Sequence, residues 1–326
     1  MFPMKILLAT DGSAEAERAA RMATMICEKL DSELHVAYVA PMPEPYAWPE
    51  DTVLYPEFSD QMRERAERDG REELGTEMEK LEGMGTEIAD SHVRAGRPDA
   101  EIVRLAEEIG AGLVVVGSRG LGPIRRAVMG SVSSSVVRHA HCPVMVVRGE
   151  TRDGDATVGP IVVAIDGSEE AKLAARVAAE LSGGTGSEIH LVFVLPTPAR
   201  MYGHHFYSAD MEKQLLERAR TEAREFLDAQ AEGVRSGGGR VAQTYLATGR
   251  SDEEIVELAE ETGAAMVVMG SRGLGGVRRA LMGSVSESVV RHAHCPVLVI
   301  RDARDRATNG DRGTNGDRGV EERADV

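Results

Sequence analysis

The chain contains an internal repeat that covers most of its length. The segment LVVVGSRGLGPIRRAVMGSVSSSVVRHAHCPVMVVR begins at Leu113 and returns with few changes as MVVMGSRGLGGVRRALMGSVSESVVRHAHCPVLVIR at Met266. Nearer the front, ILLATDGSAEAERAA at Ile6 returns as IVVAIDGSEEAKLAA at Ile161. Each copy is about 150 residues long, which is the size of a whole domain rather than of one solenoid unit. The sequence therefore predicts two tandem copies of one domain.

Polar segments without apolar periodicity separate these domains. We place the first domain at residues 1–149, a linker at residues 150–158 and the second domain at residues 159–302. Residues 303–326 contain a doubled TNGDRG and almost no large apolar side chain. Such a segment cannot bury enough apolar surface to offset the entropy of ordering, so we expect a disordered acidic and polar tail.

Within the first copy, short apolar runs alternate with amphipathic or charged segments. The runs predict strands at Lys5–Ala9, Leu34–Val39, Thr86–Val93, Leu113–Val116 and Val144–Val147. The segments between them predict helices at Ser13–Leu30, Asp60–Leu81, Asp99–Ile109 and Ser131–His139, with Ser13 as the first N-cap. This alternation is typical of right-handed βαβ units, which build a parallel sheet with helices on both faces.

The composition excludes several classes of protein. A formal net charge of -16 argues against a nucleic-acid or anionic-membrane partner, because both need clustered Lys and Arg. No apolar run reaches the roughly 18 residues of a membrane span, and the N-terminal segment lacks a secretory pattern. Cys27, Cys142 and Cys295 are too few for a disulfide framework. We therefore expect a cytoplasmic protein.

A spaced glycine motif follows the fourth predicted strand of each copy. Gly117, Gly120 and Gly130 form it in the first copy, and Gly270, Gly273 and Gly283 repeat it in the second. Glycines there can adopt positive φ and let backbone N–H groups approach a ligand closely. The helix that follows adds unpaired N–H donors and a partial positive charge, which favour phosphate. Candidate hydroxyl donors to phosphate are Ser131, Ser133, Ser284 and Ser286.

This motif differs from the two common phosphate-binding fingerprints. No Gly-Lys-Ser/Thr follows, as a Walker A loop requires, and the spacing is not that of G-x-G-x-x-G. A tight strand-to-helix turn without any ligand is the alternative explanation. The presence of two copies decides little between them, because duplicated segments start out alike.

An aspartate ends the first predicted strand of each copy. Asp11 stands in TDGS and Asp166 in IDGS. In an open α/β sheet, ligands bind beyond the carboxyl ends of the strands, at the point where the winding reverses. If the first and fourth strands are neighbours there, Asp11 and Gly117 face one crevice. A turn followed by a helix cap is the alternative explanation for Asp-Gly-Ser.

Both copies resemble the universal stress protein domain, specifically its ATP-binding branch. The first-strand aspartate, the spaced glycine motif and the closing Cys-Pro-Val strand carry the resemblance, which covers nearly the whole chain apart from linker and tail. The resemblance implies a Rossmann-like α/β fold, with a five-stranded parallel sheet in the order 3-2-1-4-5 flanked by helices. It also implies ATP, ADP or AMP as ligand, accompanied by Mg²⁺ that the phosphates mainly hold.

The resemblance also implies roles for individual residues. Asp11 and Asp166 would contact the ribose side, and Val39 and Val194 would hold adenine through backbone groups. The phosphates would be wrapped by Gly117, Gly120, Gly130, Ser131 and Ser133 in the first copy, and by Gly270, Gly273, Gly283, Ser284 and Ser286 in the second.

Domains of this family commonly dimerise by pairing their last strands. In this chain Val144–Val147 and Val297–Ile300 would pair with each other and form an intrachain pseudo-dimer, which leaves a further homodimer open. Such pairing also covers an exposed edge strand.

Three functions are compatible with these features. The first is an ATP-binding stress-response or signalling module with two sites per chain and an unknown protein partner. The second is a slow Mg-dependent ATPase, although no catalytic set is recognisable in its local context and no water-orienting residue is clearly placed. The third is a nucleotide-independent scaffold for dimerisation or partner binding. The aromatic-rich segments around Trp48 and Tyr202 are candidates for lids or a partner surface.

Overall fold

The computed structural model describes residues 5–42, 56–120, 129–149, 159–197, 209–274 and 282–301. The predicted linker at residues 150–158, the predicted tail at residues 303–326 and the aromatic-rich segments around Trp48 and Tyr202 lie outside the described residues.

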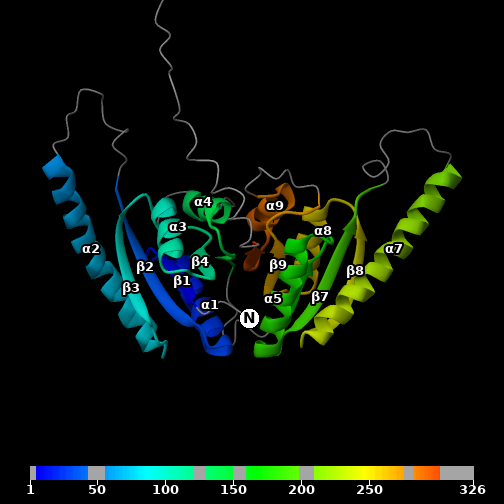
Figure 1. Ribbon diagram of the computed structural model, residues 1–326, viewed down its shortest axis with the longest axis horizontal. Coiled ribbons are helices and arrows are strands. Elements are labelled where there is room, and N and C mark those ends of the chain that lie inside the picture. The colour runs from blue at the N-terminus through cyan, green and yellow to red at the C-terminus, as the bar shows by residue number, and fades with distance from the viewer. Residues whose placement is uncertain are drawn as a thin grey trace, which may run out of the picture.

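The two domains share one mixed sheet. The first domain supplies β1 (Lys5–Thr10), β2 (Glu33–Pro41), β3 (Asp90–Gly96), β4 (Leu113–Gly117) and β5 (Val144–Val147), and the second supplies β6 (Ile161–Ala164), β7 (Glu188–Leu195), β8 (Arg240–Thr248), β9 (Met266–Gly270) and β10 (Val297–Ile300). The 10-stranded sheet has the order β3-β2-β1-β4-β5-β10-β9-β6-β7-β8. Each half therefore has the predicted order 3-2-1-4-5, and Figure 1 shows the two halves side by side.

Helices cover both faces of this sheet. They are α1 (Ala14–Leu30), α2 (Pro56–Gly83), α3 (Pro98–Glu108) and α4 (Ser131–His139) in the first domain, and α5 (Glu169–Thr185), α7 (Ala209–Ser236), α8 (Ser251–Glu261) and α9 (Ser284–His292) in the second. In β1, Ile6 and Leu8 pack with α1 and α2, whereas Leu7 packs with α3 and α4 on the opposite face. All three side chains are fully buried, which explains why the strand is a continuous apolar run.

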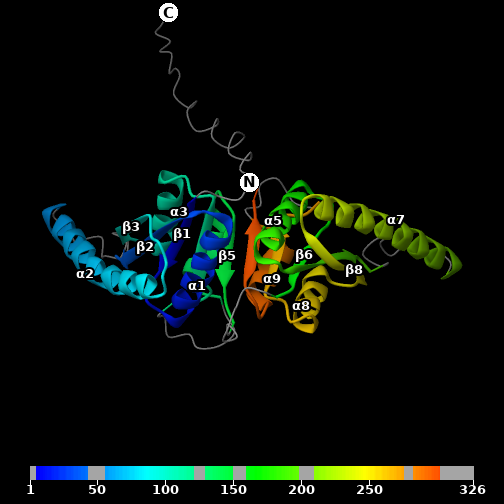
Figure 2. The same ribbon diagram turned by 90° about the horizontal axis from the view of Figure 1, so that it is seen from below.

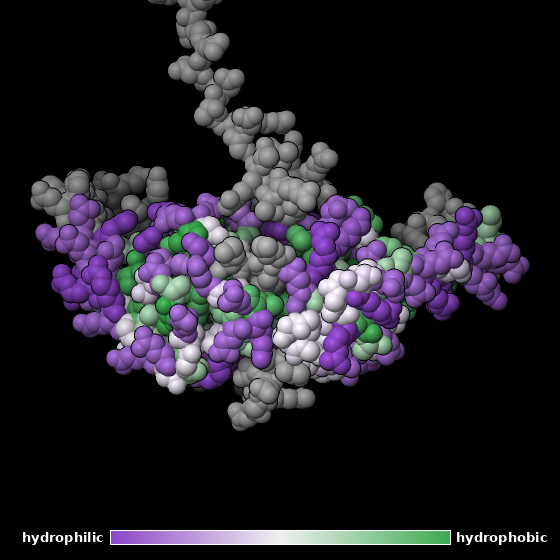
Figure 3. Space-filling view, turned by 60° about the horizontal axis from the view of Figure 1, so that its bottom comes forward, coloured by the Kyte–Doolittle hydropathy of each residue, from purple (hydrophilic) through white to green (hydrophobic). Residues whose placement is uncertain are grey.

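The outer ends of the molecule are formed by α2 and α7 (Figure 1). The visible surface at these ends is largely hydrophilic (Figure 3), as expected for long charged helices that cover only the edge of the sheet. None of the helices in the described ranges is long and apolar enough to cross a membrane.

The third strand begins later than the sequence pattern predicted. It covers Asp90–Gly96, whereas the prediction was Thr86–Val93. The hydroxyl of Thr86 is buried and shares a hydrogen bond with that of Thr24 in α1, at 3.0 Å. The apolar pattern begins at Thr86 because this residue is buried against α1, and not because it belongs to the strand.

The domains join through their closing strands. β5 and β10 pair antiparallel, with Met145 opposite Leu298, and the other strand pairs in the described ranges are parallel. Figure 2 shows β5 and β10 next to each other at the centre of the molecule. The predicted pairing of the last strands thus occurs within this chain. The buried clusters on both faces contain residues of both domains, so the core is continuous across the junction.

Two arginines connect each domain to a helix end of the other. Arg148 follows β5 and donates to the carbonyl of Ala293, at 2.9 Å, just after α9. Arg301 follows β10 and donates to the carbonyls of Val137 and Ala140, both at 2.8 Å, at the end of α4. These donors suit helix C-termini, whose last carbonyls lack intrahelical partners. Burial lowers the pKa of both arginines, although guanidinium groups remain charged in proteins.

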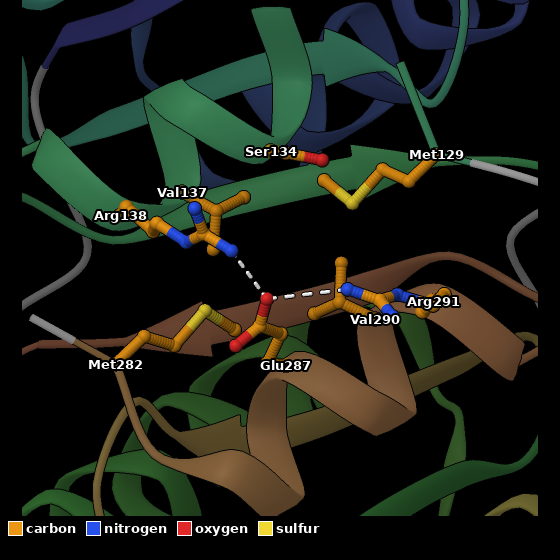
Figure 4. Close-up of a pocket in the computed structure, with 8 residues that line it drawn as sticks. All are labelled: Met129, Ser134, Val137, Arg138, Met282, Glu287, Val290 and Arg291. Atoms are coloured by element: carbon orange, nitrogen blue, oxygen red, sulfur yellow. Dashed lines mark hydrogen bonds and ion pairs between the residues drawn. The ribbon is translucent and has the colours of Figure 1, made fainter. Parts of the chain in front are cut away.

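An ion pair also crosses the junction between α4 and α9. Arg138 in α4 contacts Glu287 in α9, and Glu287 accepts a second bond from Arg291 at 3.2 Å. Figure 4 shows the carboxylate of Glu287 between the two guanidinium groups. The first domain has Ser134 at the position of Glu287, so the charge distribution at this contact is asymmetric.

Candidate functional site

A cavity of about 670 Å³ opens at the carboxyl ends of β1, β2 and β4. This volume lies within the range of about 300–1,000 Å³ that is usual for small-molecule sites. β1 pairs with β2 on one side and with β4 on the other, so the cavity lies where the winding reverses. The structure brings together here all of the site residues predicted in the first domain, namely Asp11, Val39, Gly117, Gly120, Gly130, Ser131 and Ser133.

One end of the cavity is the edge of β2. The β1–β2 pairing ends at Tyr38, whereas β2 continues along β3 as far as Pro41. Beyond Tyr38, the side of β2 that faced β1 therefore has no strand partner in the described ranges. Val39 lies in this stretch and lines the cavity, with Ile102 of α3 among the apolar walls. An exposed strand edge of this kind can hydrogen-bond the polar rim of a flat ring.

Asp11 connects β1 to the glycine motif. Its Oδ1 accepts the backbone N–H of Ser13 at 3.1 Å, and its Oδ2 lies against Gly120 so closely that a Cβ there would overlap it. Ser13 in turn caps α1, because its Oγ accepts the N–H of Ala16 at 3.2 Å. The turn-and-cap explanation of Asp-Gly-Ser therefore holds, and the same carboxylate also lines the cavity.

Glycine is required at the motif positions because it has no Cβ, not because the backbone adopts a positive φ. None of the six, all of which are described, has φ in the left-handed region, so the expectation of positive φ was wrong. A Cβ on Gly117 would instead lie 2.9 Å from the backbone carbonyl carbon of Glu15, and one on Gly270 would lie 3.1 Å from the backbone nitrogen of Ala171. Glycine thus allows the end of β4 or β9 to lie directly against the first turn of the first helix of the same domain, α1 or α5.

The N-terminus of α4 forms the opposite end of the cavity. Gly130 is the N-cap and provides no side-chain cap, and the first intrahelical bond runs from the N–H of Ser134 to the carbonyl of Gly130, at 3.0 Å. The N–H groups of Ser131, Val132 and Ser133 therefore have no intrahelical acceptor. Such a helix start attracts anions, because these N–H groups and the helix dipole both favour negative charge.

Ser133 supports the loop through its side chain. Its buried hydroxyl donates to the carbonyl of Ser118 at 3.0 Å, and the N–H of Gly130 donates to the same carbonyl at 2.8 Å. In this conformation the hydroxyl hydrogen is not available to a phosphate, so Ser133 would contribute its backbone N–H. Ser286 has the same arrangement in the second domain, where its hydroxyl donates to the carbonyl of Ser271 at 2.6 Å.

The aspartate of the second domain repeats the geometry of Asp11. Oδ1 of Asp166 accepts the N–H of Ser168 at 2.9 Å, and Oδ2 accepts the N–H of Leu274 at 3.0 Å. A Cβ on Gly273 would overlap the same Oδ2. Asp166 therefore holds the first-strand turn and the glycine loop together.

The helix start and the strand edge are also repeated. Gly283 is the N-cap of α9, and the first intrahelical bond runs from Glu287 to Gly283 at 3.0 Å, which leaves the N–H groups of Ser284 to Ser286 without intrahelical acceptors. Val194 lies beyond Val192, where the β6–β7 pairing ends. The predicted residues of the second copy, including Gly270 at the end of β9, thus occupy positions equivalent to those in the first.

Arg119 stands inside the glycine motif, where a phosphate contact and a solvated surface arginine were both possible from the sequence. It lines the cavity next to Gly120, with its side chain 38% exposed. Its Nε lies 3.7 Å from Oε1 of Glu15. A guanidinium at this place adds positive charge near the N-terminus of α4 and so favours a phosphorylated ligand. The only feature of the sequence that pointed to Arg119 as a phosphate contact was its position between Gly117 and Gly120.

Comparisons with known proteins agree on one family. The model of the Universal stress protein family matches residues 3–148 and 157–301. A universal stress protein of Mycobacterium tuberculosis is 29% identical over 315 residues, which cover 91% of this chain and 97% of the relative. A second one from that species is 34% identical over 196 residues, and the match spans only 60% of this chain and 60% of the relative.

A solved structure shows the same fold. The universal stress protein from Archaeoglobus fulgidus DSM 4304 superimposes with a TM-score of 0.65 at 24% identity, and the match covers 91% of this chain and 96% of that one.

Proposed function

The chain belongs to the universal stress protein family, and from this membership we propose that it is a stress-response protein of the cytoplasm that binds an adenine nucleotide, ATP or its products ADP and AMP. The observation that carries the proposal is the uncapped N-terminus of α4 at one end of a cavity whose other end is a strand edge. The N-terminus of α4 suits the anionic phosphates of a nucleotide, and the strand edge suits its flat base.

The chemistry of the lining suggests how the nucleotide would lie. The base would pack between apolar side chains such as Ile102 and hydrogen-bond the backbone at Val39. Asp11 would accept a hydrogen bond from a ribose hydroxyl, as acidic residues do in other doubly wound folds. The phosphates would receive the N–H groups at the start of α4 and the guanidinium of Arg119.

Mg²⁺ would enter with the phosphates. Asp11 is the acidic residue among the described residues that line the cavity, so these residues offer few oxygen ligands of their own. That donor set fits an ion whose ligands are mainly phosphate oxygens and water. Bound Mg²⁺ would neutralise part of the charge of the triphosphate.

The equivalent geometry of the second domain supports two sites per chain. Asp166 and the N-terminus of α9 repeat the features that carry the proposal for the first domain. A slow Mg-dependent ATPase and a nucleotide-independent scaffold are the alternatives that experiment must separate.

The proposal is tested by titrating the purified full chain with ATP, AMP and adenosine in a calorimeter, with and without Mg²⁺. We expect saturable ATP binding at one or two sites, weaker binding of adenosine, and a loss of affinity in Asp11→Ala. Phosphate release over many turnovers would establish the ATPase alternative. Absence of binding to all three ligands at about 1 mM, which corresponds to about −4 kcal/mol, would leave only the scaffold.

A further inference from the structure

A cluster of metal-ligand side chains lies near the amino ends of β2 and β3, outside the residues that line the nucleotide cavity. It consists of His35 in β2 and of Asp90 and His92 in β3. The parallel register places His35 opposite Asp90, and His92 follows two residues later on the same side of its strand. One potential ligand atom from each residue lies within 4.8 Å of the others.

The two imidazole nitrogens are spaced as a metal ion requires. Nδ1 of His35 lies 3.2 Å from Nε2 of His92, where the two rings share a hydrogen bond whose hydrogen a metal ion would replace. Two nitrogens bound tetrahedrally at about 2.0–2.1 Å from one Zn²⁺ are about 3.3 Å apart. Oδ2 of Asp90 lies 3.7 Å from Nε2 of His92, and the side chain of Asp90 is exposed, so it can turn toward an ion at little cost. The rings are nearly parallel, with an interplanar angle of 9°, so both would have to tilt to direct their lone pairs at one ion.

The second ring nitrogen of His35 has the environment of a metal-bound histidine. This Nε2 is buried and forms no hydrogen bond within the part of the chain that the structure describes. Oε2 of Glu33 is 3.7 Å away, one small rotation from accepting its hydrogen. Metal-bound histidines usually donate their other N–H to a carboxylate in this way. A buried polar atom without a hydrogen-bond partner is uncommon in folded proteins, so this ring nitrogen calls for an explanation.

We propose that His35, Asp90 and His92 form a binding site for a divalent transition-metal ion, with Zn²⁺ as the best match. Two imidazole nitrogens and one carboxylate suit Zn²⁺, whereas Ca²⁺ and Mg²⁺ prefer oxygen ligands only. The fourth position is open to water. Because β3 is the edge strand of the 10-stranded sheet, the ion cross-links this edge to its neighbour β2.

The second domain provides an internal comparison for this site. Its equivalent residues are His190, Gln243 and Tyr245, in the same register between β7 and β8. There Nδ1 of His190 contacts the hydroxyl of Tyr245 at 3.0 Å, and that hydroxyl donates to Oε1 of Gln243 at 3.1 Å. A neutral hydrogen-bond chain thus replaces the metal ligands, and among the residues that the structure describes this ligand set occurs in the first domain.

The test uses the full chain, stripped of metal with a chelator and titrated with Zn²⁺. The informative variant combines Asp90→Gln with His92→Tyr, which copies the residues that the second domain carries on the same backbone. We expect the wild type to bind one Zn²⁺ per chain at this site and the double variant to lose at least about 100-fold in affinity. The reciprocal pair, Gln243→Asp with Tyr245→His, should add a second equivalent.

Titration with Co²⁺ gives an independent readout. Tetrahedral Co²⁺ bound by nitrogen absorbs visible light strongly, and this band should appear in the wild type and be absent from the double variant. Circular dichroism and ATP affinity should be unchanged, and His92→Gln alone serves if the double variant folds poorly. Equal Zn²⁺ affinity in wild type and variants, or no binding to the wild type below about 100 μM, which corresponds to about −5.5 kcal/mol, overturns the proposal.

Discussion

The guanidinium of Arg272 donates two hydrogen bonds to Oε1 of Glu170, at 3.1 and 2.6 Å. Oε2 of Glu170 accepts from the hydroxyl of Ser271 and from the backbone N–H of Arg272, both at 2.7 Å. At the equivalent place in the first domain, Nε of Arg119 is 3.7 Å from Glu15. The arginine beside the glycine motif is therefore held more tightly in the second domain than in the first.

A neighbouring residue of α1 explains this difference. Nη2 of Arg18 lies 3.2 Å from Oε1 of Glu15 and so draws this carboxylate away from the motif. The second domain has Leu173 at the position of Arg18, so Glu170 has no such arginine beside it in α5. Consistent with this, the hydroxyl of Ser118 is buried and has no hydrogen-bond partner in the described ranges, unlike that of Ser271.

We predict that Arg18→Leu weakens ATP binding to the first domain. Without Arg18, Glu15 should turn to Arg119 and neutralise the guanidinium that would otherwise reach the phosphates. The expected loss is about 2- to 5-fold, which is the scale of one partly exposed ion pair. The measurement is an ATP titration in a chain whose second site is disabled by Asp166→Ala.

The reverse exchange provides the matched control. Leu173→Arg, measured in a chain that carries Asp11→Ala, should strengthen ATP binding to the second domain by a similar factor. Unchanged affinities in both exchanges would show that Arg119 and Arg272 do not reach the nucleotide.

We predict that Arg301→Met destabilises the junction between the domains. The change removes both hydrogen bonds to the end of α4 and leaves the carbonyls of Val137 and Ala140 without these donors. Hydrogen bonds to charged groups contribute about 1.5–3 kcal/mol each, so we expect the loss of both to lower the free energy of unfolding by about 3–6 kcal/mol. Urea denaturation followed by circular dichroism measures this value.

An exposed arginine controls for the loss of charge alone. Arg235 in α7 is about half exposed and pairs with Glu232 at 3.8 Å, so Arg235→Met should change stability by less than about 0.5 kcal/mol. Equal effects of the two substitutions would mean that Arg301 does not support the junction.

We predict that Cys27 and Cys295 react slowly with thiol reagents. Burial raises the pKa of Cys27 to about 12 and that of Cys295 to about 11. Since the thiolate is the reactive form, the thiolate fraction of Cys27 at pH 8 should be about 1,000-fold below that of an ordinary thiol. Mass spectrometry after timed labelling of native and urea-unfolded protein measures both rates. Native labelling of Cys27 as fast as in urea would contradict this burial.

Repeats and apolar periodicity are local patterns, and from them the sequence predicted two tandem domains of alternating strands and helices, whereas the strand order 3-2-1-4-5 came from the family resemblance. The register between strands is not local, which is why the cluster of His35 with His92, 57 residues apart, could not be anticipated. The same holds for Arg148, whose acceptor at Ala293 is 145 residues away in the other domain. Both contacts depend on which strands pair and in which alignment.

The glycine motif shows a different limit of sequence reasoning. Its spacing correctly placed Gly117 and Gly120 beside Asp11, but the physical reason for glycine was misjudged. A sequence cannot tell whether glycine is required for its φ or for its missing Cβ. Only the position of Glu15 against Gly117 identified the second reason.

The most direct test of the central claim, that the start of α4 binds phosphate, is ATP affinity in Ser131→Pro. Proline is tolerated at the first helical position and removes one N–H that has no intrahelical acceptor. Gly130 already has φ −63° and ψ 151°, which suits a residue before proline. Ser131→Ala removes only the hydroxyl and is the matched control.

In a chain that also carries Asp166→Ala, ATP affinity should fall at least about 10-fold from Ser131→Ala to Ser131→Pro, because a hydrogen bond to a charged group contributes about 1.5–3 kcal/mol. Adenosine affinity should be equal in the two variants, since adenosine has no phosphate to lose this contact. Equal ATP affinity in the two variants would contradict the claim.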